Sequence, residues 1–334
     1  MFNNHMVNYS NYTQVQLLVN YPVTSTTSTA PAKFILFGEH AVVYGYPSIA
    51  CPLLQLKSTA KITPHCSPQN NHSRIIAPDI NLVSSLDKSN RKHKLVKVIN
   101  TILNSLNITS TFKDSIHVVS DIPLSSGLGS SASISTAVIK ALNDHLNLNL
   151  TTEQINKFVY ETEVIQHGSP SGVDNTVIAY EKPILYQKDY PTEALSPPVP
   201  LLFIVANSGT PSSTFNSINK FTKNYKNNKR VYDTAMQNIT EIVREGKNAF
   251  NSGDYKLLGQ LMNQNHEILD ALGVTTQLTN ILVKTSLESG ALGAKISGAG
   301  YGGNIVAITE KEHYQEVSSA LAKISSHTII TQIS

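Results

Sequence analysis

A loop rich in glycine and serine, PLSSGLGSSA at residues 123–132, contains the residue types that bind phosphate groups. Gly127 and Gly129 carry no side chain, so the backbone there can approach an anion closely. From Ser130 onward apolar residues recur three and four positions apart, which predicts an amphipathic helix. The free N–H groups of its first turn and the positive end of its dipole would face the same anion. The loop therefore predicts a phosphate site, and a flexible turn is the alternative interpretation.

Spacing excludes two better-known phosphate-binding loops. The pattern G-x-x-x-x-G-K-[ST] of P-loop nucleotide hydrolases is absent from the chain. Gly127, Gly129 and Ala132 match the G-x-G-x-x-A pattern of dinucleotide-binding domains, but the predicted strand at residues 115–121 ends too early to lead directly into them. A similar glycine run at residues 298–303 is followed by the strand-like NIVAI rather than by a helix. A dinucleotide-dependent oxidoreductase is therefore a distant alternative.

The segment PAKFILFGEHAVVYGYP, residues 31–47, places a lysine, a glutamate and a histidine around one predicted buried strand. A buried ammonium group without a partner is costly, so Lys33 at the start of this strand predicts an anionic partner. Glu39 and His40 follow the end of the strand, where binding groups are commonly mounted. The alternative is that Lys33 extends its ammonium group to solvent and that Glu39 and His40 are surface residues.

Two carboxylates complete the candidate set. HGSPSGVDN at residues 167–175 forms a predicted tight turn after a helix, and this turn would aim Asp174 as a base or an ion-pair partner. A turn-capping aspartate is the alternative. Glu163 borders the apolar face of the preceding predicted helix, whereas Glu161 points away from it. A carboxylate there requires a cation, and Mg²⁺ suits a site beside phosphates because one or two protein oxygens hold it. An ordinary glutamate on the helix flank is the other interpretation.

The elements that must position these residues divide into two halves. Strands and helices are mixed in residues 21–190, and the proline-rich segment 189–200 lacks periodicity, which predicts a domain boundary there. Residues 200–334 show a strand, several helices, two strands around a glycine turn, a helix and a final strand. This order predicts an α+β sandwich. Residues 1–20 are expected to be a poorly ordered N-terminal extension.

Composition narrows the classes of function. The net charge is only +3 and the basic residues are scattered, so a nucleic-acid or membrane-surface role has little support. The apolar runs are too short for a membrane span. Cys51 and Cys66 show neither C-x-x-C nor metal-ligand spacing, which suits a reducing cytoplasm. The composition therefore favours a cytoplasmic globular protein.

Together these segments resemble the GHMP family of small-molecule kinases, over almost the whole chain from about residue 22. Residues 31–45 are similar to the family's first motif, residues 123–132 to its second, and KISGAGYGGNIVAI at residues 295–308 to its third. HGSPSGVDN and NQNHEILDALGV, residues 263–274, resemble segments of family members that act on mevalonate. The resemblance implies two domains, an N-terminal one like ribosomal protein S5 domain 2 and a ferredoxin-like C-terminal one.

The resemblance also implies a reaction, in which ATP phosphorylates the primary C5 hydroxyl of mevalonate to give 5-phosphomevalonate in isoprenoid biosynthesis. Asp174 matches the catalytic aspartate, which either accepts the hydroxyl proton or mainly orients the hydroxyl, and Lys33 matches the lysine beside it. Ser131 and Glu163 match the ligands of Mg²⁺. The residues that match the phosphate cradle for ATP are Ser125, Ser126, Gly127, Leu128, Gly129, Ser130 and Ser131. The residues that match contacts to mevalonate are Glu39, His40 and Thr214.

Two residues depart from the family's third motif. Tyr301 replaces a usual glycine, and Asn304 stands where a small residue or a cysteine is common. Two alternatives stay open, namely another kinase of the family, acting on phosphomevalonate or a sugar, and a non-catalytic sensor of ATP and a small ligand. The joint presence of the lysine, the serine and the two carboxylates argues against a sensor. The resemblance also allows a homodimer.

Overall fold

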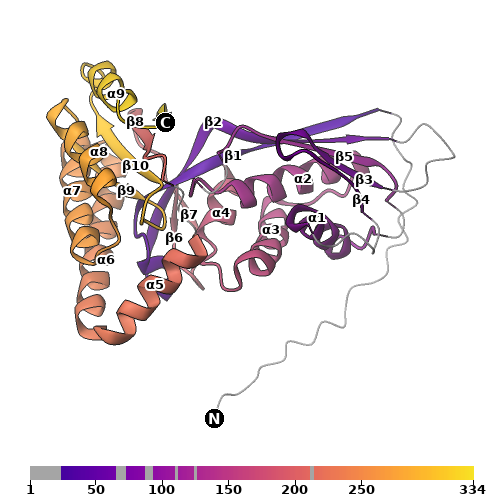
Figure 1. Cartoon of the computed structure of the whole chain (residues 1–334), viewed down its shortest axis with the longest axis horizontal. Helices are drawn as coiled ribbons and strands as arrows, with labels where there is room; N and C mark the ends of the chain where they lie inside the picture. The colour runs from indigo at the N-terminus through magenta and orange to yellow at the C-terminus, as the bar shows by residue number, and fades with distance from the viewer. Residues whose placement is uncertain (1–23, 65–72, 87–92, 110–111, 124–125, 211–213) are drawn as a thin grey trace, which may run out of the picture.

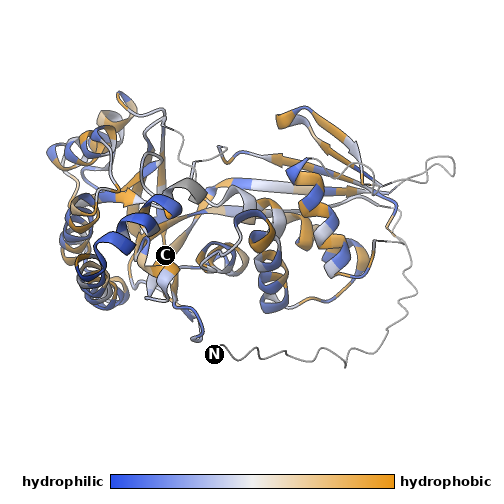
Figure 2. Cartoon of the chain, turned by 60° about the horizontal axis from the view of Figure 1, so that its bottom comes forward, coloured by the Kyte–Doolittle hydropathy of each residue, from blue (hydrophilic) through white to orange (hydrophobic). Residues whose placement is uncertain are grey.

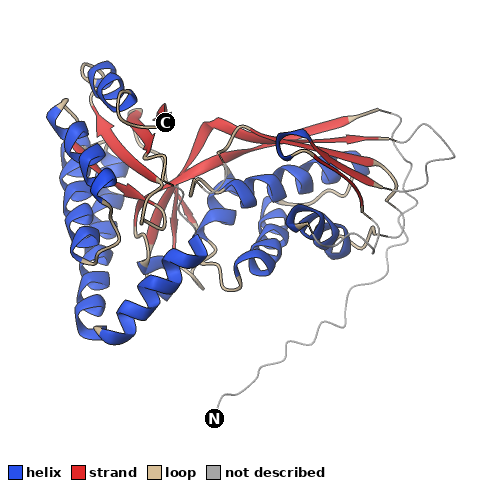
Figure 3. Cartoon of the chain, viewed as in Figure 1, coloured by secondary structure: helices blue, strands red, loops and turns tan. Residues whose placement is uncertain are grey.

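The structure is a computed structural model that describes residues 24–64, 73–86, 93–109, 112–123, 126–210 and 214–334. Two sheets organise the described residues, one of seven strands and one of four. Figures 1 and 3 show the two sheets side by side, with the long strands β1 and β2 extending from the larger sheet toward the smaller one.

The larger sheet has the strand order β4-β3-β5-β2-β6-β7, and β1 pairs antiparallel with β2. Its strands are β1 (Thr26–Phe37), β2 (Ser48–Thr63), β3 (Arg74–Ala77), β4 (Leu82–Ser85), β5 (Ser115–Ser120), β6 (Ile184–Tyr186) and β7 (Glu193–Ala194). β1 is longer than its apolar run KFILF suggests, so Lys33 lies inside the strand and not at its start. The register shifts between Pro31 and Ala32, where proline has no N–H to donate to the ladder.

Four helices cover one face of this sheet (Figure 1). They are α1 (Lys94–Ser105), α2 (Ser130–Leu146), α3 (Thr152–His167) and α4 (Val173–Tyr180). Helix α3 begins at Thr152, directly after Thr151, which forms a reciprocal capping box with Gln154. Asp174 differs from expectation: it lies in the first turn of the short helix α4 rather than in a free turn. The preceding Gly172 caps α4 with a φ of 95°.

The smaller sheet has the strand order β11-β8-β10-β9 and is antiparallel throughout. Its strands are β8 (Leu201–Asn207), β9 (Gly293–Ser297), β10 (Asn304–Thr309) and β11 (His327–Ile333). When β8, β9, β10 and β11 are numbered 1 to 4, the strand order is 4-1-3-2. This is the order of a ferredoxin-like fold, as expected.

Helices form the longer connections between the strands of this sheet. They are α5 (Thr214–Asn227), α6 (Lys229–Ser252), α7 (Tyr255–Ala271) and α8 (Gln277–Glu288) between β8 and β9, and α9 (Tyr314–Ala322) between β10 and β11. Figure 2 shows hydrophilic residues on the outer faces of the helices and apolar residues toward the sheets. Among the described residues no helix has the length and apolar character that a membrane span requires.

The two sheets share one apolar core at their junction. Phe34 of β1 packs against Phe203 of β8 with ring centroids 5.4 Å apart. Ser297 of β9 joins the backbone of β1, because its Oγ donates to the carbonyl of Ile35 and accepts from the N–H of Ile35, both at 2.9 Å. Strand β1, which carries Lys33, is therefore fixed on both sides.

Candidate active site

Lys33 and Asp174 form an ion pair between β1 and α4. The Lys33 Nζ atom lies 2.8 Å from Asp174 Oδ1, and only 3% of the lysine side chain is exposed, against 35% of the aspartate. Lys33 therefore has the anionic partner that its burial demands and does not extend to solvent. A Cβ atom at Gly172 would lie 2.1 Å from the Tyr186 hydroxyl, so the turn that delivers Asp174 requires glycine.

The glycine-rich loop approaches this pair closely. Gly127 and Gly129 have φ values of 80° and 78°, which few other residues adopt. A Cβ atom at Gly129 would lie 3.0 Å from Cγ of Lys33. The Lys33 N–H donates to the carbonyl of Leu128 at 3.0 Å. The loop thus packs directly on the strand that carries the lysine, and it leads into α2 at Ser130 as expected.

A serine and a buried glutamate meet beside the loop. Ser131 Oγ donates to Glu163 Oε1, and Gln166 Nε2 donates to the same Ser131 oxygen. His167 Nε2 lies 3.7 Å from Glu163 Oε2. Burial raises the pKa of Glu163 to about 7, and the negative charge of Asp174 adds to this, while the Ser131 hydrogen bond opposes it. A carboxylate in such surroundings is stabilised in its charged form by an added cation.

The GEH segment, residues 38–40, directly follows β1 and is buried. Glu39 forms an ion pair with Lys295 of β9, and neither side chain is exposed. His40 adopts a φ of 60° and stacks on Phe221 of α5, with ring centroids 4.3 Å apart. Burial lowers the pKa of His40 to about 4, and the Lys295 charge contributes, so the imidazole is neutral at neutral pH. His40 Nε2 is buried and has no hydrogen-bond partner.

A cavity of about 1400 Å³ brings most of the predicted residues together. Those that line it are Lys33, His40, Ser126, Gly127, Gly129, Ser130, Ser131, Glu163 and Asp174. Glu39 and Leu128 do not line it, since Glu39 is paired with Lys295 and the Leu128 side chain lies in the core. Ser125 lies outside the described residues, and so does the side chain of Thr214, at the start of α5.

Sequence reasoning missed several residues of this cavity. Gln166 contacts the predicted metal ligand Ser131, and Ile218 and Asn219 of α5 form part of the wall. The position of Gln166 on the same helix face as Glu163 could have identified it, because helical neighbours three residues apart lie side by side. No comparable signal pointed to Ile218 and Asn219, because most residues of α5 are polar and the sequence did not predict a helix there.

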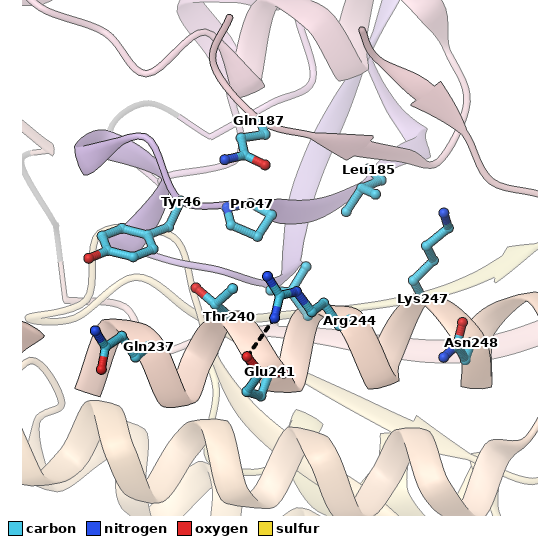
Figure 4. Close-up of a pocket in the computed structure, with 11 residues that line it drawn as sticks. Tyr46, Pro47, Leu185, Gln187, Gln237, Thr240, Glu241, Arg244, Lys247 and Asn248 are labelled. Atoms are coloured by element: carbon cyan, nitrogen blue, oxygen red, sulfur yellow. Dashed lines mark hydrogen bonds and ion pairs between the residues drawn. The ribbon is translucent and has the colours of Figure 1, made fainter. Parts of the chain in front are cut away.

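A second cavity, of about 590 Å³, lies between α6 and the segment around Pro47 (Figure 4). Arg244 pairs there with Glu241 at 2.6 Å, and Lys247 pairs with Glu193 at 2.7 Å. These charged side chains already have partners of opposite sign, and none of the predicted site residues lines this cavity. The larger cavity is therefore the candidate active site.

The chain is similar to known proteins over almost its whole length. The GHMP kinases N terminal domain matches residues 93–182, and the GHMP kinases C terminal domain matches residues 247–326. The mevalonate kinase of Thermococcus sibiricus is 35% identical over 325 residues, which span 92% of this chain and 96% of that protein. The crystal structure of L. major mevalonate kinase in complex with R-mevalonate superposes with a TM-score of 0.79 at 27% identity, covering 93% of this chain and 96% of that one. The Methanococcus jannaschii mevalonate kinase structure superposes with a TM-score of 0.77 at 28% identity, covering 92% and 98%.

Proposed function

This chain belongs to the mevalonate kinases of the GHMP kinase family, and on that premise we propose how its residues transfer a phosphoryl group. The enzyme uses ATP to phosphorylate the primary hydroxyl of mevalonate in the mevalonate pathway of isoprenoid biosynthesis. The observation that carries the proposed mechanism is the Lys33–Asp174 pair, which lies 2.8 Å apart in the wall of the cavity that the phosphate loop also lines. Phosphoryl transfer depends mainly on positioning and charge neutralisation, and this arrangement supplies both.

Asp174 acts on the attacking hydroxyl group. Its carboxylate is partly exposed to the cavity, so it can accept a hydrogen bond from the primary hydroxyl of mevalonate. It orients that hydroxyl toward the γ-phosphorus and takes its proton as the new O–P bond forms and the bond from the γ-phosphorus to the leaving ADP breaks. Lys33 is held by its contact with Asp174, and its ammonium group stabilises the negative charge that develops on the attacking oxygen.

The loop and the start of α2 hold the phosphates of ATP. The N–H groups of the first turn of α2 have no partner within the helix, and Ser126 Oγ is buried without a hydrogen-bond partner. Both lie in the wall of the cavity and can donate to phosphate oxygens. The positive φ values of Gly127 and Gly129 allow the backbone to curve around the anion.

Ser131 and Glu163 fit a Mg²⁺ ion. Both offer oxygen atoms, they lie in direct contact, and burial leaves the Glu163 carboxylate in need of a cation. One or two protein oxygens together with phosphate oxygens are the usual surroundings of Mg²⁺. When bound, the ion would neutralise charge on the ATP phosphates.

His40 is the residue of the GEH segment that can touch mevalonate. Its neutral imidazole lines the cavity and has a free Nε2 atom, which can form one hydrogen bond to the substrate. A direct contact by Glu39 has no support from its placement against Lys295. Thr214 stays a candidate contact.

A coupled assay of ADP release tests the substrate. Mevalonate should support turnover, whereas phosphomevalonate, galactose and homoserine should not. Phosphorus NMR of the product should show a phosphate on the primary C5 oxygen. A 3-phosphate, or turnover with phosphomevalonate alone, would contradict the assignment.

Three further features are part of the proposal. We place the enzyme in the cytoplasm, and we infer domains at residues 21–190 and 200–334, which the two separate sheets support. A homodimer is tested by light scattering after size-exclusion chromatography, where a mass near 36.4 kDa would contradict it.

A further inference from the structure

Asn304, the first residue of β10, forms a hydrogen bond to the phosphate loop across the junction of the two sheets. Its side-chain Nδ2 donates to the backbone carbonyl of Ser126. Only 1% of Asn304 is exposed, so water does not replace this contact. Asn304 is also one of the two departures from the third motif, where a small residue or a cysteine has no N–H group to offer.

The orientation of the Asn304 amide is set from the other side. Asn207, the last residue of β8, lies directly opposite Asn304 in the ladder, and its Nδ2 donates to Asn304 Oδ1 at 2.9 Å. Asn207 Oδ1 in turn accepts from the N–H of Gly209 at 2.8 Å and from Ser326 Oγ at 2.9 Å. The oxygen of Asn304 therefore faces Asn207, and its NH₂ group faces the loop.

The loop needs such a contact because two of its residues are glycines. Gly127 and Gly129 have access to many backbone conformations, and ordering them costs conformational entropy when a ligand binds. Ser126 precedes Gly127 directly, and the next backbone contact of the loop to the strand layer is the Leu128 carbonyl, which accepts from Lys33. The Asn304 hydrogen bond thus holds the residue before Gly127, while the Lys33 N–H holds the residue after it.

We propose that Asn304 is a positioning residue that holds the phosphate loop in its nucleotide-binding conformation, with Asn207 as its support. This inference rests on the proposed role of the loop in binding the phosphates of ATP. Asn304 acts through the Ser126 carbonyl and contributes to ATP affinity, because the loop is ordered before ATP arrives. It leaves the affinity for mevalonate and the transfer step unchanged.

Steady-state kinetics of Asn304→Ala test this role, together with equilibrium titration of a fluorescent ADP analogue in the absence of mevalonate. A lost hydrogen bond predicts that the KM for ATP and the Kd for the analogue rise about three- to tenfold, while kcat and the KM for mevalonate stay within about twofold. Asn304→Asp should raise both further, because a carboxylate cannot donate to the Ser126 carbonyl and repels the phosphates. Asn304→Ser, which restores a small residue common in the family, keeps the test usable if the alanine variant folds poorly.

The matched control is Asn263→Ala. Asn263 of α7 also joins its side-chain amide to the backbone of a neighbouring segment, since it donates to the Leu292 carbonyl at 3.4 Å and accepts from the N–H of Ala294 at 3.0 Å. It does not line the cavity. This variant should lose thermal stability without any change in ATP affinity, so a general loss of packing is distinguished from a loss of loop order.

Gly127→Val separates failure of this inference from failure of the proposed loop function. Valine strongly disfavours the φ of 80° at that position, so the variant should weaken ATP binding if the loop holds phosphates. If Gly127→Val weakens ATP binding and the Asn304 variants do not, the positioning role is wrong. If neither weakens it, the phosphate-binding role of the loop itself is wrong. Equal rises in both KM values for Asn304→Ala would also overturn the inference.

Discussion

Glu39 and Lys295 form an ion pair that solvent does not reach, although Glu39 follows β1 of the larger sheet and Lys295 lies in β9 of the smaller one. Burial raises the pKa of Glu39, and the charge and hydrogen bond of Lys295 oppose this shift. The pair holds the residue next to His40, whose backbone is in the left-handed region. The contact therefore links the junction of the two sheets to the wall of the active site.

Breaking this pair should destabilise the enzyme more than removing both charges. Glu39→Gln or Lys295→Met alone leaves one buried charge without a partner, which typically costs about 3–5 kcal/mol of unfolding free energy. The double variant should lose much less than the sum of the two single losses. Urea unfolding of the three variants measures this, and additive losses would show that the two residues act independently.

The stability contributed by His40 should depend on pH. Its pKa is about 4 in the folded enzyme, below the value of about 6.5 for an unfolded histidine, so between these values only the unfolded state binds the proton. The contribution is therefore complete above pH 6.5 and is lost as the pH falls toward 4, by on the order of 2–3 kcal/mol.

His40→Asn is the comparison for this prediction, because asparagine tolerates a positive φ. Urea unfolding at a series of pH values should show that the wild type loses its advantage over the variant between pH 6.5 and pH 4. A difference that stays constant with pH would mean that His40 titrates normally in the folded state.

Glu163→Gln should raise the Mg²⁺ concentration needed for half-maximal activity by about tenfold or more, because a carboxamide is a weaker ligand for the ion. The Mg²⁺ dependence of nucleotide binding, measured without turnover, should shift in the same direction.

Glu161→Gln is the matched control for Glu163, on the same helix. Its Oε2 accepts from Ser105 Oγ at 2.7 Å, and it does not line the cavity. It should change neither measurement. Equal effects at both positions would remove Glu163 from the set of metal ligands.

Local patterns in the sequence predicted the parts of the fold that depend on neighbouring residues. The start of α2 at Ser130 follows from the periodicity of its apolar residues, and the ferredoxin-like arrangement of the smaller sheet follows from the motif resemblance. The short strands β3 and β4 have only four residues each, too few for a periodic signal. The helix α4 has only eight residues and follows Pro170 and Gly172 closely. These two residues are typical of turns, so the sequence predicted a turn at Asp174 and not a helix.

The contacts that complete the site come from residues far apart in the chain, and no local pattern reports them. The predicted burial of Lys33 indicated that its ammonium group has an anionic partner. The residues next to it in the sequence do not show that this partner is Asp174. The motif resemblance predicted that Glu39 contacts the substrate. In the structure Glu39 pairs with Lys295, because β9 packs against the end of β1. The Asn304 contact to Ser126 likewise appears only when β10 and the loop meet.

The most direct test of the account is the turnover of Asp174→Asn, Lys33→Met and the double variant. Loss of a positioned base typically costs on the order of 10²–10⁴ in rate, so Asp174→Asn should nearly abolish kcat while its affinity for ATP stays within a few-fold. Lys33→Met should also be severely impaired. Because both groups act on one oxygen, the double variant should lose much less than the product of the two single effects. Near-normal turnover in Asp174→Asn would remove this residue from the active site, and fully multiplicative losses would contradict a joint role for the pair.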